Sequence, residues 1–299
     1  MSNLLFKSLR FGSRAFGKIS RTLNSLSSNF APKDIQETLV RGSTCYDMVV
    51  APDEPYYAEQ YWHVISPFLT GIAEEAQCLD LGCSQGRFSL RLARRFPKGK
   101  VLACDISEPA IAAARRNADK AGLRNLEFRV ESIGQTLQSC GTESQDMVLM
   151  TEVTFFYPDW QLQMDEIMRV LRPGALLLMS FRSQYFDALC LVRGRFWHNT
   201  GMLLEKRRGY IFDGQLEFSW NTSEEIRALL TCEYGLDILE LCGIGTCSGI
   251  PGDPHEQMAR PSQLDSTEQK QLLGLELELG RSVPDAGRYI LAVARKKKR

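Results

Sequence analysis

The chain has 299 residues, of which 44% are hydrophobic and 24% are charged, and its formal net charge is zero. These are ordinary globular proportions, and they allow one large domain with a sizeable core. No run of 18 apolar residues occurs, so the sequence predicts no membrane-spanning helix.

Positive charge is concentrated at the two ends of the chain. Residues 1–33 hold six basic residues and no acidic one, and residues 295–299 are all basic. The rest of the chain is therefore net acidic. Phosphate contacts need Lys and Arg on one surface, so we expect no nucleic-acid partner.

The basic leader, residues 1–33, is also rich in serine, and several of its apolar residues share one helical face. Three interpretations stay open: a mitochondrial targeting peptide, a helix on an anionic membrane surface, and a lid or disordered leader without a targeting role. We accordingly expect a cytoplasmic protein, or one of the mitochondrial matrix if the source is eukaryotic. Peripheral membrane contact through the leader is left open, as is the oligomeric state.

Nine cysteines are scattered through the chain without a C-x-x-C pair or a histidine at metal-ligand spacing. This pattern indicates buried free thiols in a reducing compartment and no metal site.

An aromatic helix is predicted over residues 55–72. The stretch from residue 76 to residue 88 then reads as a strand and a glycine-bearing turn, and a second helix begins near Gly86. Ligands of parallel sheets bind at the carboxyl ends of the strands, where this turn lies. Gly82 lets the backbone approach a ligand closely. A dinucleotide fingerprint would need glycines where Ser84 and Arg87 stand, which argues against a nicotinamide site.

The segment from Leu79 to Gly86 resembles the first motif of class I S-adenosylmethionine (SAM) methyltransferases, with Ser84 replacing the usual glycine. The resemblance implies an α/β fold: a Rossmann-like, doubly wound, seven-stranded sheet, mostly parallel with an antiparallel last strand, plus cap insertions. It also implies SAM as the cofactor. The first motif would supply these cofactor contacts: Asp80, Gly82, Cys83, Ser84 and Gly86.

A second strand over residues 101–105 ends in Asp105, 23 residues after Gly82. A carboxylate there can accept hydrogen bonds from both hydroxyls of a ribose. Ser107 is predicted to cap the following helix, and Gly122 to close it. By resemblance, the cofactor would further contact Tyr57, Asp105, Ile106, Glu131, Ser132 and Thr151, with Glu131 and Ser132 beside the adenine.

A fourth strand over residues 146–151 is followed by an aromatic run. Phe155, Phe156 or Tyr157 could face a sulfonium or a substrate ring, and we expect one of the three at the site. Residues 175–181 form the fifth strand, and residues 236–241 and 287–294 close the sheet. The aromatic run looks like the small-molecule branch that includes nodulation-type N-methyltransferases and ubiquinone-pathway enzymes.

Two insertions, residues 182–220 and 243–286, are expected to form a substrate cap on a methyltransferase domain spanning residues 34–299. The first holds a hairpin turning at Asp213 and Gly214. If Arg193 and Arg195 point inward, they favour an acceptor with a carboxylate or phosphate.

The resulting hypothesis is a SAM-dependent methyltransferase, a transferase that methylates an O or N atom of a small molecule. General-base candidates are His63, Glu152, Tyr157, His198 and His255. Alternatives are a non-catalytic SAM-binding assembly or regulatory protein, an RNA methyltransferase using the basic tail, and a nicotinamide-dependent oxidoreductase.

Overall fold

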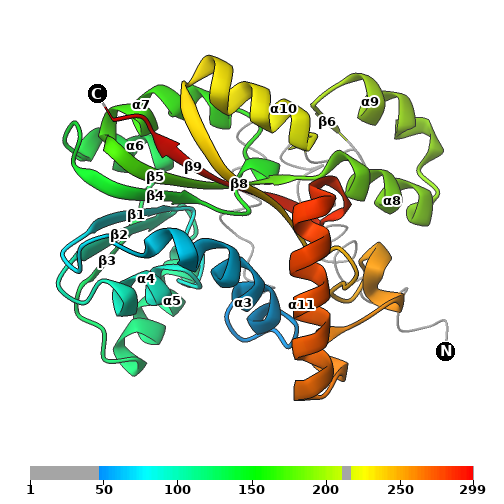
Figure 1. Cartoon of the computed structure of the whole chain (residues 1–299), viewed down its shortest axis with the longest axis horizontal. Coiled ribbons are helices and arrows are strands. Elements are labelled where there is room, and N and C mark those ends of the chain that lie inside the picture. Colours follow the sequence, from blue (N-terminus) through cyan, green and yellow to red (C-terminus); the bar gives the residue numbers. More distant parts are fainter. Residues whose placement is uncertain (1–46, 211–216, 299) are drawn as a thin grey trace, which may run out of the picture.

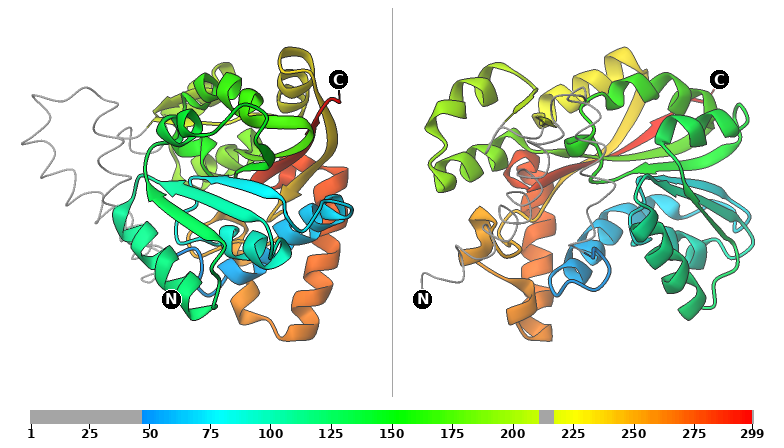
Figure 2. Two further views of the ribbon diagram at one scale, coloured as in Figure 1. Left: turned by 90° about the vertical axis from the view of Figure 1, so that its left-hand side faces the viewer. Right: turned by 180° about the vertical axis from the view of Figure 1, so that it is seen from behind.

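A computed structural model describes residues 47–210 and 217–298. At its centre lies one seven-stranded sheet (Figures 1 and 2). Its strands are, in chain order, β1 (Gln77–Leu81), β2 (Lys100–Asp105), β3 (Leu126–Val130), β4 (Gln145–Met150), β5 (Leu171–Arg182), β8 (Leu236–Ile244) and β9 (Tyr289–Lys296).

The strands lie in the order β3-β2-β1-β4-β5-β9-β8. The pairs from β3 to β5 are parallel, whereas β9 runs antiparallel to both of its neighbours. This arrangement confirms the predicted mostly parallel sheet with an antiparallel last strand. Because β1, β2 and β4 are parallel neighbours, the turns that follow them meet at one edge of the sheet.

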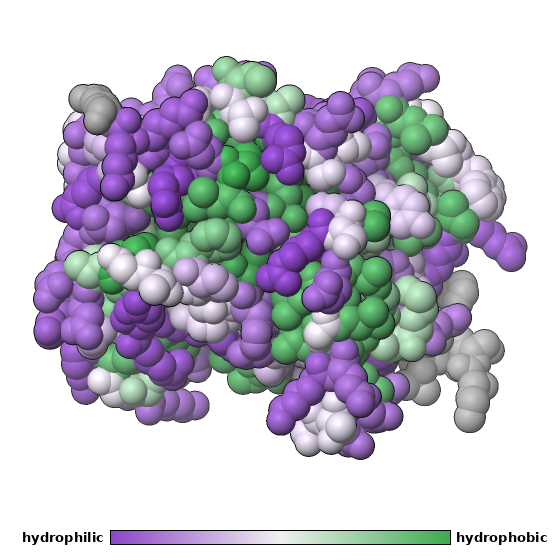
Figure 3. Space-filling view, viewed as in Figure 1, coloured by the Kyte–Doolittle hydropathy of each residue, from purple (hydrophilic) through white to green (hydrophobic). Residues whose placement is uncertain are grey.

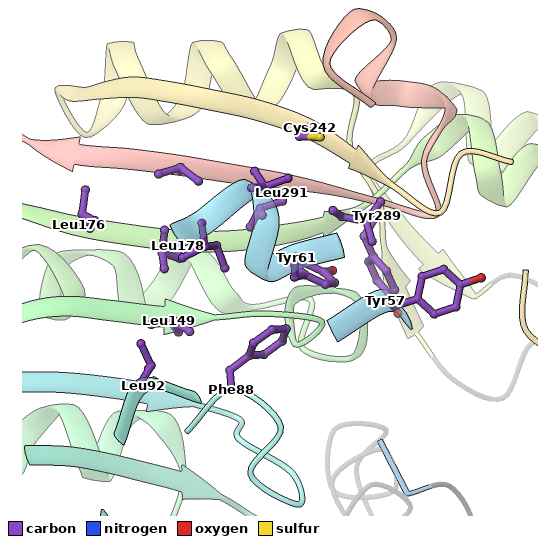
Figure 4. Close-up of a cluster of buried hydrophobic side chains, with 14 of the residues drawn as sticks. Tyr57, Tyr61, Phe88, Leu92, Leu149, Leu176, Leu178, Cys242, Tyr289 and Leu291 are labelled. Atoms are coloured by element: carbon purple, nitrogen blue, oxygen red, sulfur yellow. The ribbon is translucent and has the colours of Figure 1, made fainter. Parts of the chain in front are cut away.

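Helices cover both faces of the sheet, which confirms the doubly wound α/β class. On one face lie α3 (Glu54–Ile65), α4 (Ser89–Arg95), α5 (Glu108–Lys120) and α11 (Ser266–Ser282); on the other lie α6 (Ile133–Ser139), α7 (Met164–Val170) and α10 (Ser223–Ala228). Strand side chains alternate between the faces. Leu149 packs in the first core, under α3, α4 and α11, and Met150 packs in the second core, under α6, α7 and α10. In Figure 4, Tyr61 of α3 lies between the sheet and Phe88 in the first core.

Helix ends follow local sequence signals. The Ser107 hydroxyl accepts the Ala110 N–H at the start of α5, and Gly122 adopts φ +66° after its end, as predicted. The helix expected over residues 55–72 is shorter: α3 ends at Ile65 and a 3₁₀ turn, Ser66–Leu69, follows because Pro67 cannot donate a backbone hydrogen bond.

The first insertion contains α8 (Gln184–Gly194), α9 (Thr200–Glu205) and a short antiparallel pair, β6 (Arg208–Tyr210) with β7 (Glu217–Ser219). These strands match the predicted hairpin, and its turn at Asp213 and Gly214 lies outside the described residues. Hydrophobic side chains reach the surface over α8 and α9 (Figure 3).

Residues 1–33, the basic leader, also lie outside the described residues. Among those described, no helix combines the length and apolar character needed to cross a bilayer, and no three metal-binding side chains gather into a site. The described cysteines are free. In the basic tail, the Lys296 amino group donates to the carbonyls of Met168 and Leu171 at the end of α7, at 2.6 and 2.7 Å.

Candidate functional site

A cavity of about 980 Å³ opens at the carboxyl ends of β1, β2 and β4. Pockets for one drug-sized ligand span roughly 300 to 1,000 Å³, so this one is at the upper end of that range. Of the predicted cofactor residues, those lining it are Asp80, Gly82, Cys83, Ser84, Asp105, Ile106, Glu131, Ser132 and Thr151. Glu152 and Tyr157 are the base candidates that line it.

The turn after β1 holds the backbone close to the cavity. Gly82 and Gly86 have φ of +77° and +88°, and Ser84 adopts φ +48° despite its Cβ. A Cβ on Gly82 would lie 2.3 Å from a methyl carbon of Val153, so only glycine fits there without displacing that side chain. The turn is therefore both left-handed and tightly packed.

Asp105 connects two loops at the cavity edge. Its carboxylate accepts the backbone N–H of Ser84 at 2.9 Å and that of Ser107 at 2.8 Å. A carboxylate offers about four acceptor positions, so one such group can serve several donors at once. The arrangement fixes the Asp105 side chain at the wall of the cavity.

Asp80 is 2% exposed and accepts a 2.5 Å hydrogen bond from the Ser89 hydroxyl. Burial raises the pKa of Asp80 to about 6, while the Ser89 hydrogen bond acts in the opposite direction. This buried carboxyl consequently ionises near neutral pH, and a bound cation would favour its charged form.

Glu131 and Ser132 lie where β3 ends. The Glu131 carboxylate accepts the Thr136 hydroxyl at 3.0 Å. Ser132 forms a capping box with Gln135 at the start of α6. Both residues line the cavity, but their side chains also serve the helix that follows.

Arg87 joins the cofactor turn to the segment after β4. Its guanidinium donates to Glu54 and to Glu152, each at 2.7 Å, and none of the three side chains is more than 9% exposed. Glu152 has φ +58°, and its N–H donates to the Ser180 hydroxyl at 2.6 Å. Burial alone would raise the pKa of Glu152, but Arg87 and Arg288 hold it below its ordinary value.

The aromatic run after β4 contributes more than expected. Phe155, Phe156 and Tyr157 all line the cavity, whereas the sequence predicted one of them. Phe155 stacks on Phe218 of β7 at 4.5 Å between ring centroids, and the Tyr157 hydroxyl accepts Gln163 at 2.9 Å. The Phe155–Phe218 contact joins the hairpin to the aromatic run.

The remaining predicted site residues lie away from the cavity lining. The Tyr57 hydroxyl bonds Ser248 at 3.1 Å, and a Cβ on Gly86 would face Ala114 and Phe128. The other three are histidines: His63 and His198 are exposed, and His255 is buried with Nδ1 3.2 Å from the Gly245 carbonyl oxygen.

Sequence reasoning missed Arg182, Arg288 and Tyr289, which line the cavity from β5 and the start of β9. The predicted arginines differ: Arg193 reaches Glu256 at 3.5 Å outside the lining, and Arg195 is exposed. No local motif marks the arginines that do line the cavity, because the pairing of β5 with β9 brings them together.

The sequence is similar to known methyltransferases and related SAM enzymes. Residues 72–194 match the model of a family described as "Methyltransferase domain". A carboxy-S-adenosyl-L-methionine synthase from Actinobacillus succinogenes is 28% identical over 120 residues, which cover 39% of this chain and 48% of that protein. The chain thus matches about half of the length of this curated relative.

Two solved structures share the fold. A magnesium protoporphyrin IX methyltransferase from Synechocystis, with bound S-adenosylhomocysteine (SAH), has a TM-score of 0.55 at 15% identity, covering 88% of this chain and 100% of that one. The N-methyltransferase NodS from Bradyrhizobium japonicum, also with SAH, has a TM-score of 0.50 at 15% identity, covering 89% and 98%.

Proposed function

Starting from the match of residues 72–194 to a methyltransferase-domain family, we propose that the chain is a class I SAM-dependent methyltransferase that transfers a methyl group from SAM to an O or N atom of a small-molecule acceptor. One observation carries the proposal: a single cavity is lined both by the Gly82 turn with Asp105 and by the aromatic run 155–157. We call the first group of lining residues the cofactor side and the second, with the residues of the two insertions, the acceptor side. A cofactor and an acceptor could therefore lie in contact.

The lining fits SAM at three points. Asp105 would accept the ribose hydroxyls, and Glu131 with Ser132 would lie beside the adenine. Asp80 and the turn at Gly82 would hold the amino-acid portion, whose ammonium group suits a buried carboxylate. When bound, SAM supplies the electrophilic methyl group, and this cofactor requires no metal.

The acceptor side would act mainly by positioning and by excluding water. Phe155 and Phe156 give it an apolar wall. Glu152 is held ionised by Arg87, so it would orient a donor group of the acceptor more effectively than it would take up a proton. Tyr157 is the second polar group there that could contact the acceptor.

The two insertions would cover the acceptor. Residues 182–220 contribute Arg208 and Tyr210 to the lining, and residues 243–286 contribute Ile250 and Asp253. We also keep, as proposals, a membrane contact through residues 1–33 and the small-molecule branch of the family. An RNA acceptor is less favoured, because Lys296 of the basic tail is bonded inside the fold.

The test combines cofactor binding with turnover. Calorimetry should detect SAH binding, and a panel of amines, phenols and carboxylic acids with SAM should include an acceptor that yields SAH. Glu152→Gln should lower turnover with little effect on SAH affinity, and Asp119→Ala, at an exposed site, should change neither. Tight SAH binding without turnover on any class would instead favour a non-catalytic SAM-binding protein.

A further inference from the structure

Two buried guanidinium groups line the acceptor side of the cavity. Arg182 ends β5 and Arg288 directly precedes β9, and each side chain belongs to a residue that is only 8% exposed. A buried N–H group without a partner costs free energy unless water or a ligand accepts it. The hydrogen bonds that these two guanidinium groups already make therefore show which of their N–H groups remain for a ligand.

Arg182 is held rigidly with part of its donor set unused. Its Nε donates to Asp187 at 2.7 Å, and its guanidinium carbon lies 4.7 Å from the ring centroid of Phe155 and 4.5 Å from that of Phe186. Its Nη2 donates weakly to the Cys190 sulfur at 3.8 Å, and within the described residues Nη1 donates no hydrogen bond. The two rings and Asp187 fix the plane of the guanidinium, so the free edge is preorganised for a ligand.

Arg288 is fixed in a similar way. Its Nη1 donates to Asp253 at 3.2 Å, and its Nη2 is 3.9 Å from Glu54, beyond hydrogen-bond distance. Its Nε donates to no described residue. The guanidinium carbon lies 5.3 Å from the ring centroid of Tyr57.

Tyr289 connects the two arginines. Both guanidinium carbons lie 5.3 Å from the centroid of its ring, and the antiparallel register sets Tyr289 opposite Arg182. The Tyr289 hydroxyl has no hydrogen-bond partner among the described residues, and Tyr289 lines the cavity. Burial raises the pKa of Tyr289 to about 12, so the hydroxyl remains a donor at neutral pH.

The acids of the same region do not offer a matching site for a cation. Four acids line this part of the cavity, and each already accepts a hydrogen bond from an arginine: Glu152, Asp159, Glu217 and Asp253. Asp187 lies behind Arg182 rather than in the lining. The unused groups of Arg182, Arg288 and Tyr289 are donors, and donors in a fixed fork suit an oxyanion.

We propose that Arg182, Arg288 and Tyr289 form an oxyanion subsite, so that the methyl acceptor carries a carboxylate or a phosphate monoester on an apolar body. Phe155, Phe156 and Ile250 line the rest of this side and would contact that body. This proposal rests on the proposed function, since it names the class of acceptor for the same cavity.

Matched probes test the subsite in the SAH complex. Benzoate, phenyl phosphate and benzamide share one ring and differ in their terminal group, and saturation-transfer NMR measures their binding. We expect benzoate or phenyl phosphate to bind about tenfold more tightly than benzamide, the value of one charge-assisted hydrogen bond. The stronger of the two anions identifies the terminal group.

Substitutions test whether the anion binds at Arg182, Arg288 and Tyr289. Arg182→Gln, Arg288→Gln and Tyr289→Phe should each weaken anion binding, the arginine changes by about tenfold, while SAH affinity measured by calorimetry stays unchanged. Arg124→Gln removes an exposed charge and should alter neither measurement. Because Arg182→Gln leaves Asp187 buried and unpaired, the double variant with Asp187→Asn provides a second route to the same result.

Three results would overturn the subsite. Benzamide could bind as tightly as the anions, neither anion could bind, or both arginine variants could keep the native anion affinity. Failure of SAH to bind would instead contradict the proposed function. The same three probes titrated without SAH would then still test the oxyanion subsite.

Discussion

The two sides of the cavity are built in different ways. On the cofactor side, backbone N–H groups of one turn and one helix start bond to the carboxylate of Asp105. On the acceptor side, long side chains from distant segments meet, as when Arg288 bonds Asp253 of a far loop. The cofactor side is therefore local and backbone-made, whereas the acceptor side depends on tertiary packing and can change without disturbing the other.

Arg87 joins the two sides of the cavity, so we expect its replacement to lower the stability of the protein more than any other proposed change. Arg87→Ala would leave Glu54 and Glu152 buried without their shared cation, which we expect to cost about 3–5 kcal/mol of unfolding free energy. Denaturant titration measures the loss. The control is Arg91→Ala, whose pair with Glu59 is partly exposed and should be worth about 0–1 kcal/mol. Equal losses in both variants would contradict a buried junction.

Removal of the Asp105 carboxylate tests the cofactor side alone. Asp105→Ala should weaken SAH binding by about 2–4 kcal/mol, because two hydrogen bonds to a charged group are lost. Calorimetry measures the affinity, with circular dichroism to verify folding. Asp119→Ala, at a side chain 71% exposed, should bind as the native chain does. An unchanged SAH affinity in Asp105→Ala would remove the ribose assignment.

The contrast also explains what the sequence could predict. The turn at Gly82, the acid at Asp105 and the cap at Ser107 all lie within a few residues of a strand end, where local patterns can be read. These patterns carried the resemblance to class I methyltransferases, and the resemblance in turn implied the sheet and the predicted cofactor contacts. Arg182 and Tyr289 become neighbours only through the pairing of β5 with β9. No spacing rule relates residues that far apart.

A sequence pattern can also predict a helix correctly without showing what its side chains contact. The resemblance implied that Tyr57, on the aromatic helix, contacts the cofactor. Instead, Tyr57 bonds Ser248, and the neighbouring Tyr56 hydroxyl bonds the fully buried Glu276 of α11 at 2.6 Å. A tyrosine's partner depends on which helix packs against it, and residue spacing along α3 carries no such information.

The close packing of Gly82 against Val153 can be tested by adding a single carbon atom. Gly82→Ala adds a Cβ at φ +77° and 2.3 Å from Val153, so we expect a loss of about 2–3 kcal/mol in stability together with weaker SAH binding. Gly122→Ala, at φ +66° with nothing within 4 Å of the added carbon, isolates the backbone strain of about 1 kcal/mol. Thermal unfolding of both variants would contradict the close packing if the two losses were the same.

The buried carboxyl of Asp80 gives the cofactor side a pH dependence. Its pKa is raised to about 6, and we propose that only the ionised form pairs with the ammonium of the ligand. SAH affinity should then rise with pH up to about 6 and level off above it, falling by up to about tenfold per unit below. Asp80→Asn should flatten this profile. Since the Ser89 hydrogen bond lowers the pKa of Asp80, Ser89→Ala should move the profile to higher pH; a profile unmoved by both changes would exclude Asp80 as its source.

Ser84 offers the smallest and most local test. It adopts φ +48° in a turn where related motifs carry glycine, so Ser84→Gly should relieve left-handed strain of about 1–2 kcal/mol. Glycine also adds about 0.5–1 kcal/mol of chain entropy to the unfolded state, which leaves a net gain of about 1 kcal/mol or less. Glu143→Gly, at φ +50° and outside the cavity lining, should show the same small gain in thermal stability. SAH affinity separates the two: if the serine hydroxyl, which donates to Gln85 at 2.7 Å, helps to shape the turn, affinity falls only in Ser84→Gly. A stability loss in Ser84→Gly alone would mean that this hydroxyl outweighs the strain, and that the cofactor side depends on side chains as the acceptor side does.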